Sequence, residues 1–261
     1  MTTTDTSPAA IASRFVNSTG RHVFLTGKAG TGKTTFLRNI KARTHKNAFI
    51  AAPTGIAAIN AEGVTLHSLF QLPFGTFIPA NVPFNQGDIS VQLNNPQTLV
   101  RGIQMNKDKR AMLREFELLI IDEVSMLRAD LLDAIDHVLR YIRRKRDIPF
   151  GGVQILFIGD LHQLPPVVKE DEKKYLDPWY ASPYFFEAHA LQSNEPIYIE
   201  LDKIFRQSDK QFISILNNLR DNKITEDDLK VLNQHYKPGY SPAKNDTGSV
   251  YLTTHNYKAN E

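Results

Sequence analysis

The chain has 261 residues, of which 41% are hydrophobic and 23% charged, an ordinary composition for one large or two modest globular domains. It has no cysteine, which excludes disulfides, cysteine-ligated zinc and a thiol nucleophile and fits a cytoplasmic location. The net charge of +3 is too small to indicate nucleic-acid binding; no apolar run approaches the ~18 residues of a membrane span, and the start has no secretory-signal pattern.

Short apolar runs predict six strands along the chain. They are His22–Thr26, Asn47–Ala52, Phe116–Asp122, Val153–Asp160, Ile197–Leu201 and Ser249–His255. Several are continuously apolar, which indicates burial on both faces and therefore a parallel sheet covered by helices.

Helical patterns lie between these strands. Thr34–Arg43 follows the first strand, Leu127–Lys145 repeats apolar residues at three- and four-residue steps, and Gln211–Arg220 with Glu226–Tyr236 predicts a helix pair. The alternation of strands and helices predicts an α/β fold. Residues 72–106 carry four prolines and three glycines without a clean period, so we expect a functional loop or a small subdomain there.

The most specific motif is Gly27-Lys28-Ala29-Gly30-Thr31-Gly32-Lys33-Thr34, which matches the phosphate-binding P-loop in full between a strand and a helix. Its backbone amides wrap phosphates, Lys33 neutralises the β and γ oxygens, and the Thr34 hydroxyl reaches Mg²⁺. The predicted ATP-binding residues are Gly27, Ala29, Gly30, Thr31, Gly32, Lys33, Thr34 and Thr35.

Two further strand ends carry polar groups. Asp122 and Glu123 follow an apolar strand, so Asp122 is predicted to hold Mg²⁺ and Glu123 to deprotonate the attacking water. Gln163, in a Gly-Asp-Leu-His-Gln segment after the fourth predicted strand, is placed to contact the γ-phosphate, although an ordinary turn stiffened by prolines is the alternative.

Other segments are less specific. Pro53, Thr54 and Gly55, with His67 and Phe70 shortly after, fit sugar-phosphate and base contacts, but taken alone they fit a loop and a packed helix start better. Arg206 fits stabilisation of the γ-phosphate charge, or a surface ion pair. The basic cluster Arg140–Arg146 fits a solvated helix end better than a DNA contact.

Taken together and in order, these segments resemble the Pif-one family of superfamily 1B DNA helicases, close to RecD-type enzymes. The matching pieces are Gly27–Thr35, Ala52–Ala58 with Thr65–Phe70, Ile121–Met126, Asp130–Gly152, Gly159–Val167 and Leu201–Gln207. The resemblance implies an ATP- and Mg²⁺-dependent motor that binds single-stranded DNA and duplex junctions and moves 5′ to 3′. It implies catalytic roles for Lys33, Glu123, Gln163 and Arg206, and DNA contacts by Pro53, Thr54, Gly55, His67 and Phe70.

The resemblance also implies a domain plan. Residues 1–71 and 107–200 form a RecA-like ATPase domain, 72–106 an inserted wedge subdomain, and 201–261 the beginning of a second RecA-like domain, so we expect an N-terminal fragment of a monomeric enzyme. No glutamine precedes Gln71 to recognise adenine, so Phe15 or Asn17 is expected to line the adenine pocket instead.

Other P-loop proteins remain as alternatives. A non-helicase ATPase switch or loader acting on a protein partner shares the P-loop and the Asp122-Glu123 pair. A small-molecule kinase leaves Glu123 and the segment 159–167 unexplained. A GTPase is disfavoured because Asn106-Lys107-Asp108 lacks the spacing that recognises guanine.

Overall fold

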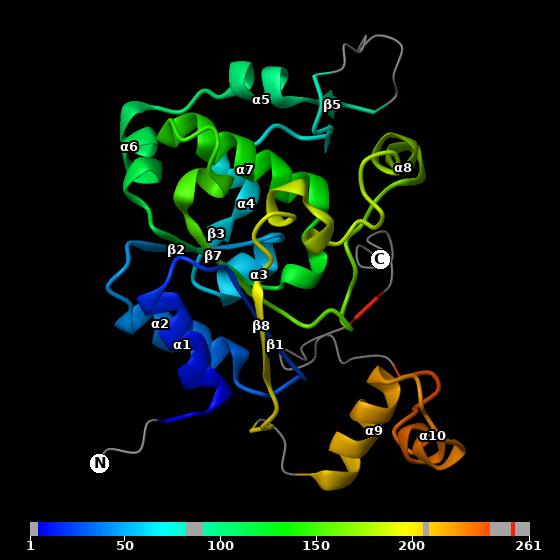
Figure 1. Cartoon of the computed structure of the whole chain (residues 1–261). Helices are drawn as coiled ribbons and strands as arrows, with labels where there is room; N and C mark the ends of the chain where they lie inside the picture. Colours follow the sequence, from blue (N-terminus) through cyan, green and yellow to red (C-terminus); the bar gives the residue numbers. More distant parts are fainter. Residues whose placement is uncertain (1–4, 82–90, 206–208, 241–251, 254–261) are drawn as a thin grey trace. The chain divides into compact units, whose positions relative to one another are not determined.

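The computed structural model describes residues 5–81, 91–205, 209–240 and 252–253. The chain divides into two compact units, Met1–Ser208 and Asp209–Glu261. The first unit contains the sheet and all of the predicted nucleotide-site residues that the structure describes (Figure 1).

A six-stranded parallel sheet forms the centre of the first unit, which confirms the predicted fold class. Its strand order is β3-β2-β6-β7-β1-β8. The strands are β1 (Val23–Gly27), β2 (Ala48–Ala52), β3 (Val64–Thr65), β6 (Leu118–Ile121), β7 (Gln154–Ile158) and β8 (Ile197–Leu201). Five of them match predicted runs; β3 was not predicted, because two residues carry no readable pattern.

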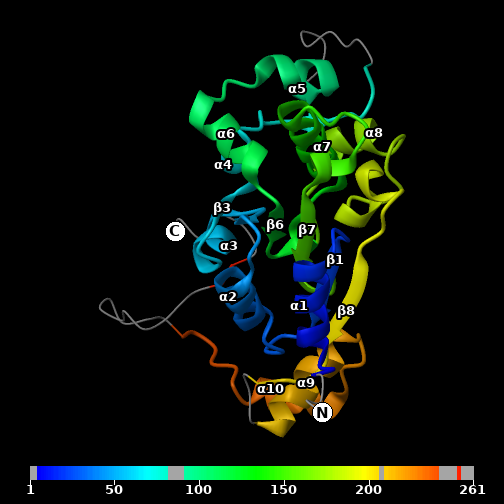
Figure 2. The same ribbon diagram turned by 60° about the vertical axis from the view of Figure 1, so that its left-hand side comes forward.

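Helices cover both faces of this sheet, as the continuously apolar strands require (Figures 1 and 2). On one face α1 (Pro8–Ser18) and α2 (Lys33–Arg43) pack on alternate strand residues such as Leu25 and Ile120. On the other face α4 (Leu66–Phe70), α6 (Lys107–Glu115) and α7 (Ala129–Arg143) pack on the intervening residues.

Helix α7 has the predicted apolar face but also buries three aspartates that the pattern did not indicate. Each aspartate accepts a backbone amide from a different segment. Asp130 accepts from Phe77 at 3.1 Å, Asp133 from Ala190 at 2.9 Å, and Asp136 from Phe150. Helix α7 therefore fixes three loops through polar anchors as well as through apolar packing.

The described part of 72–106 is folded. It contains the parallel pair β4 (Thr76–Phe77) and β5 (Leu93–Asn94), followed by α5 (Pro96–Gly102). Phe77 and Leu99 belong to the same core as the main sheet and α7, so this segment shares the hydrophobic interior of the first unit.

Shorter elements complete the first unit. They are α3 (Gly55–Asn60), α8 (Glu170–Leu176), and the 3-10 turns η2 (Val124–Met126), η3 (Pro149–Gly152), η4 (Phe185–Glu187) and η5 (His189–Leu191). In the second unit the predicted helix pair is present as α9 (Lys210–Arg220) and α10 (Glu226–Asn233). The predicted strand 249–255 falls almost entirely outside the described residues.

Buried His22 gives the fold a predictable pH dependence. Its side chain is 2% exposed, its Nδ1 accepts the Ile155 amide at 3.0 Å, and burial lowers its pKa to about 4. Because the folded pKa lies below the unfolded value of 6.5, the stabilising contribution is complete above pH 6.5 and is lost as the pH falls towards 4.

We therefore expect His22→Asn, which keeps an acceptor but cannot titrate, to flatten the acid side of the stability profile. Between pH 7 and pH 4 the wild-type chain should lose about 3 kcal/mol more unfolding free energy than the variant. Urea denaturation of both proteins at several pH values measures this difference. Parallel stability curves would contradict a neutral buried His22.

Candidate nucleotide site and nucleic-acid contacts

The P-loop turns sharply between β1 and α2, and glycine is required where the turn begins. Gly27 has a φ of 152°, and a Cβ there would lie 2.6 Å from both the Leu201 carbonyl oxygen and Thr31 Oγ1. Gly32 has a φ of 93° and caps α2 without any side-chain hydrogen bond to the first-turn amides. The loop therefore packs tightly on β8, and the start of α2 presents backbone donors.

Lys33 folds back over this loop from the first turn of α2. Its Nζ donates to the carbonyl oxygens of Gly27 at 2.6 Å and Lys28 at 3.2 Å. Thr31 is buried, and its hydroxyl donates to the Lys28 carbonyl at 2.9 Å. The ammonium group is thus placed inside the curve of the P-loop, where an anion would be surrounded by backbone amides.

The acidic pair follows β6, two strands away in the sheet. Burial raises the pKa of Asp122 to about 6. The hydrogen bond from the Glu123 amide and the positive charge of Lys33 both act in the opposite direction and lower this pKa. Glu123 adopts a left-handed backbone conformation with a φ of 51°, which is strained for a glutamate. Lys33 and Asp122 therefore lie on the same side of the molecule.

Strand β7 brings a third polar segment to this edge, between β6 and β1. A Cβ on Gly159 would lie 2.9 Å from the Val124 amide nitrogen, so the chain passes directly against the turn that follows Glu123. Asp160 is buried and accepts the His162 amide at 3.1 Å, whereas Gln163 is exposed. His162 is exposed and lies outside the cavity that Gln163 lines.

These segments meet around one cavity of about 420 Å³. Its lining residues are Ala29, Gly30, Gly32, Lys33, Thr34, Thr35, Glu123, Gln163 and Phe205. Residues that follow β1, β6 and β7, far apart in the sequence, are thus brought together at one edge, as the parallel topology predicts, and Phe205 joins them from beyond β8. The arrangement offers a cation, hydroxyls, a carboxylate and an amide to a single ligand.

Phe205 is a cavity residue that the sequence did not single out. Its backbone amide donates to the Gly30 carbonyl at 2.8 Å, and its ring lies 3.8 Å from the position of a Cβ on Gly32. A lone aromatic residue after a strand carries no motif, so only the packing of this segment on the P-loop identifies it. The neighbouring Arg206, predicted to complete the site, lies outside the described residues.

Sequence reasoning placed the adenine-pocket residues at the wrong end of the sheet. The Phe15 carbonyl accepts a hydrogen bond from Gln154, the first residue of β7, and Thr19 accepts from Lys46 just before β2. The C-terminal end of α1 therefore lies at the amino ends of the strands. Phe15 and Asn17 do not line the P-loop cavity, which is at the carboxyl ends.

The first three predicted DNA contacts lie together after β2. Pro53 and Thr54 are half-buried, Gly55 is exposed, and Thr54 Oγ1 caps α3 by accepting the Ala57 amide at 3.3 Å. A Cβ on Gly55 would meet nothing within 4 Å. The α3 start is therefore open at the same carboxyl edge of the sheet as the nucleotide cavity.

His67 and Phe70 both lie in α4 but have opposite surroundings. His67 is partly exposed and stacks on Phe74 with ring centroids 5.9 Å apart, and Phe74 is 79% exposed. Phe70 is 0% exposed and stacks on Phe116 in the core, so its predicted contact with bases is corrected. The apolar repeat of α4 points Phe70 inward, whereas Phe74, which the sequence did not indicate, supplies an accessible ring.

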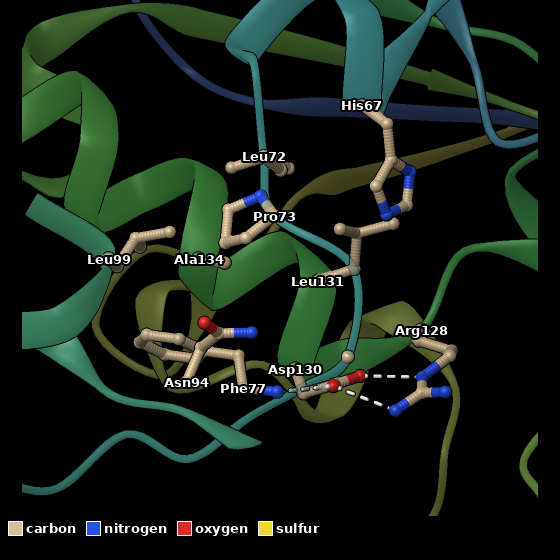
Figure 3. A pocket seen from close by; sticks show the side chains of 11 residues that line it. His67, Leu72, Pro73, Phe77, Asn94, Leu99, Arg128, Asp130, Leu131 and Ala134 are labelled. Atoms are coloured by element: carbon tan, nitrogen blue, oxygen red, sulfur yellow. Dashed lines mark hydrogen bonds and ion pairs between the residues drawn. The ribbon is translucent and has the colours of Figure 1, made fainter. Parts of the chain in front are cut away.

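Beside His67 lies a small cavity of about 70 Å³, bordered by an ion network (Figure 3). Arg128 Nε and Nη2 each donate to Asp130 at 2.9 Å, Nη1 donates to Glu172 at 3.1 Å, and Nη2 reaches the Thr76 hydroxyl at 3.4 Å. Burial by itself would lower the pKa of Arg128. The hydrogen bonds and negative charges of Asp130 and Glu172 outweigh burial, so the pKa of Arg128 is raised. The network ties β4 and α8 to the start of α7.

Two members of the predicted basic cluster are structural. Arg140 pairs with Asp136 at 2.7 Å, and Arg143 donates to the carbonyl oxygens of Gly151, Leu113, Arg114 and Phe116.

No helix in the described part of the chain is long and apolar enough to cross a membrane.

Comparison with known proteins gives concordant matches. The family model described as PIF1-like helicase matches residues 6–230. The chain is 38% identical over 213 residues to the ATP-dependent DNA helicase PIF7 of Trypanosoma brucei brucei, covering 81% of this chain and 19% of that protein.

Solved structures of Pif1 helicases match as well. The Bacteroides Pif1 helicase in complex with ADP-AlF3 and single-stranded DNA has a TM-score of 0.84 and 40% identity, covering 98% of this chain and 55% of that chain. A structure of two coordinating Pif1 helicases at forked double-stranded DNA has a TM-score of 0.77 and 42% identity, covering 88% and 51%. These structures match the RecA-like α/β sheet. The chain spans about half the length of the solved Pif1 helicases, and it belongs to the PIF1-like helicase family.

Proposed function

We propose that this chain is the N-terminal motor portion of an ATP-driven DNA helicase that moves 5′ to 3′ on single-stranded DNA and separates duplex junctions. The observation that carries the proposal is the single cavity shared by Lys33, Thr34, Glu123 and Gln163. A cation, a hydroxyl, a carboxylate and an amide around one cavity suit a nucleoside triphosphate and a water molecule poised to attack it.

The polar residues of the cavity have proposed roles. The P-loop backbone with Lys33 and Thr35 holds the phosphates, Glu123 takes the proton from the attacking water, and Gln163 contacts the γ-phosphate. The proposal extends to Arg206 as a further source of positive charge at the γ-phosphate.

Mg²⁺ fits the donors present. Thr34 offers a hydroxyl at the cavity, and Asp122 is a half-buried carboxylate directly after β6, whose pKa is raised by burial. Thr34 and Asp122 would hold the ion, which would neutralise charge on the β and γ phosphate oxygens.

The DNA strand is proposed to cross the carboxyl edge beside the nucleotide cavity. Pro53, Thr54 and Gly55 would hold the sugar-phosphate backbone through the open start of α3, and His67 would meet a base. The matching Bacteroides Pif1 helicase was solved in complex with single-stranded DNA, which supports this choice of partner.

The domain plan remains part of the proposal. Residues 1–71 and 107–200 act as the ATPase domain, 72–106 as the wedge, and 201–261 as the beginning of a second motor domain in a cytoplasmic, monomeric enzyme. Since two motor domains sandwich the nucleotide in such enzymes, this chain alone is expected to bind ATP but to hydrolyse it poorly.

Lys33→Ala tests the nucleotide site directly. The change removes the charged donor inside the P-loop, so we expect the affinity for a fluorescent ATP analogue with Mg²⁺ to fall about 30-fold, since a hydrogen bond from a charged group contributes about 2 kcal/mol. Fluorescence anisotropy on the 261-residue chain measures the affinity. Lys28→Ala is the matched control, because that lysine is in the same loop but does not line the cavity. Equal affinities for both variants would remove Lys33 from the site.

The response to DNA separates a helicase motor from an ATPase switch that acts on a protein partner. With the remainder of the motor supplied, ATP hydrolysis should rise with added single-stranded DNA, because a motor that moves on DNA couples ATP turnover to the strand, whereas a partner-gated switch need not respond to DNA. Hydrolysis indifferent to DNA would favour the switch.

A further inference from the structure

A second polar pocket lies where α6 meets the C-terminal end of α7, two helices that pack side by side (Figure 1). It has a volume of about 490 Å³. Its lining residues are Arg110, Arg114, Tyr141, Ile142, Arg144, Arg146 and Asp147. Four arginines around one hollow give a local positive charge that the overall charge of the chain does not reveal.

This pocket is remote from the nucleotide cavity. Arg143, beside the pocket, donates to the Phe116 carbonyl just before β6, so this end of α7 lies at the amino ends of the strands. Helix α7 starts at the opposite edge, after the turn that carries Glu123, and its 15 residues span roughly 22 Å. The arginine pocket is therefore separate from both the P-loop and the proposed strand path.

The guanidinium groups are held in position by backbone contacts. Arg110 Nε donates to the Met105 carbonyl and Arg114 Nε to the Ile142 carbonyl, each at 3.1 Å. Arg140 Nη1 donates to the Arg146 carbonyl at 2.9 Å and fixes the loop after α7. Within the described ranges no ion pair engages the four pocket arginines, so their terminal nitrogens remain available as donors.

Arg144 occupies a position that suits glycine better. It follows the last residue of α7 with a φ of 56° and a ψ of 32°, the left-handed conformation in which glycine is usual at a helix end. An arginine in this conformation is strained relative to glycine, because its Cβ crowds the following carbonyl oxygen. The side chain, rather than the backbone, is therefore the reason to place arginine at this point of the pocket.

We propose that this arginine pocket binds the sugar-phosphate backbone of a nucleic-acid strand, as a second contact that goes beyond the proposed function of the carboxyl edge. The guanidinium groups bind phosphates, and the ring of Tyr141, which is 38% exposed, stacks on a base. Asp147 disfavours a free polyphosphate but can accept a hydrogen bond from a base amino group. Arginines interleaved with an accessible aromatic ring match a strand better than an isolated anion.

The test compares two double variants that remove the same charge. Arg144→Gln with Arg146→Gln changes the pocket, and Arg14→Gln with Arg43→Gln changes exposed arginines on α1 and α2. Both are made in the His67→Ala background to weaken the carboxyl-edge contact. Binding of a fluorescent oligonucleotide is followed by anisotropy at several salt concentrations, without nucleotide.

We expect the pocket variant to bind DNA about tenfold more weakly than the control variant, with a salt slope shallower by about 1.4, since each lost phosphate contact of a single strand contributes about 0.7. Equal affinities and slopes for the two variants would overturn the proposal. Both should bind the ATP analogue equally, so a failure of the nucleotide site is recognised separately.

Three further variants exclude a purely structural effect. Arg144→Gly should raise or preserve the melting temperature and still weaken DNA binding about threefold, because glycine suits the backbone but offers no charge. Tyr141→Ala should weaken binding about fivefold or more, and Tyr141→Phe should restore it. DNA affinity that follows melting temperature in this series would contradict a binding role.

Competitors identify other occupants. If inorganic phosphate binds through Arg144 and Arg146 while the two double variants bind DNA equally, the pocket is a site for a small anion. This result would overturn the proposal. If polyglutamate displaces labelled DNA as effectively as unlabelled DNA of equal charge does, the pocket fits an acidic protein. This result would also overturn the proposal.

Discussion

Replacing Glu123 with glutamine is expected to leave ATP binding unchanged while lowering the hydrolysis rate about 10³-fold, the usual contribution of a positioned general base. Glu123 lines the nucleotide cavity together with Lys33 and Gln163, and its backbone adopts a strained left-handed conformation of the kind that clusters at active sites. Glutamine keeps the shape and can still hydrogen-bond a water molecule, but it cannot accept the proton.

The measurement uses the chain joined to a second motor domain, as the proposed function requires, and follows single-turnover hydrolysis and analogue binding in parallel. Glu195→Gln is the matched control, because Glu195 is exposed and does not line the cavity. Hydrolysis by Glu123→Gln within a few-fold of the control would remove Glu123 as the base. Lost binding would instead assign it to holding the nucleotide.

Arg128→Met is expected to reduce the unfolding free energy by about 3–5 kcal/mol, because it leaves the buried carboxylate of Asp130 and the half-buried carboxylate of Glu172 without their common partner. The side chain of Asp130 is only 4% exposed and would keep only the Phe77 amide as a described hydrogen-bond partner. The loss acts where β4 and α8 join the start of α7, so this junction should loosen first.

Urea denaturation of the 261-residue chain measures the effect. Arg38→Met is the control, since the Arg38–Glu62 pair is 3.6 Å apart and both side chains are more than half exposed, so its removal should cost under 1 kcal/mol. Combining Arg128→Met with Asp130→Asn should cost less than the sum of the single changes, because the two groups compensate each other. Additive losses would contradict the coupling.

Much of the nucleotide site could be predicted from the sequence, because each of its motifs consists of residues that are neighbours in the chain. A P-loop is a continuous run whose glycines and lysine act through their own backbone, and Asp122 with Glu123 directly follows a strand whose apolar residues are unmistakable. Parallel strands place such ends at one edge by topology, so the sequence alone predicts that Lys33, Glu123 and Gln163 lie together.

Features that depend on packing between segments distant in the chain could not be predicted from the sequence. The core position of Phe70, the exposed ring of Phe74 and the contact of Phe205 with the P-loop follow from which face of each element the neighbours cover. The misplacement of Phe15 has the same origin, since the direction of α1 across the sheet is a tertiary property.

The sequence by itself determined the α/β class, five of the six strands and the phosphate-binding chemistry, because strand periodicity and loop motifs are encoded by neighbouring residues. The tertiary structure alone decided which polar side chains share a pocket. The arginine pocket joins α6 to the loop after α7, and the network of Arg128 joins β4, α7 and α8, because long-range packing brings charges together over separations that no local pattern spans.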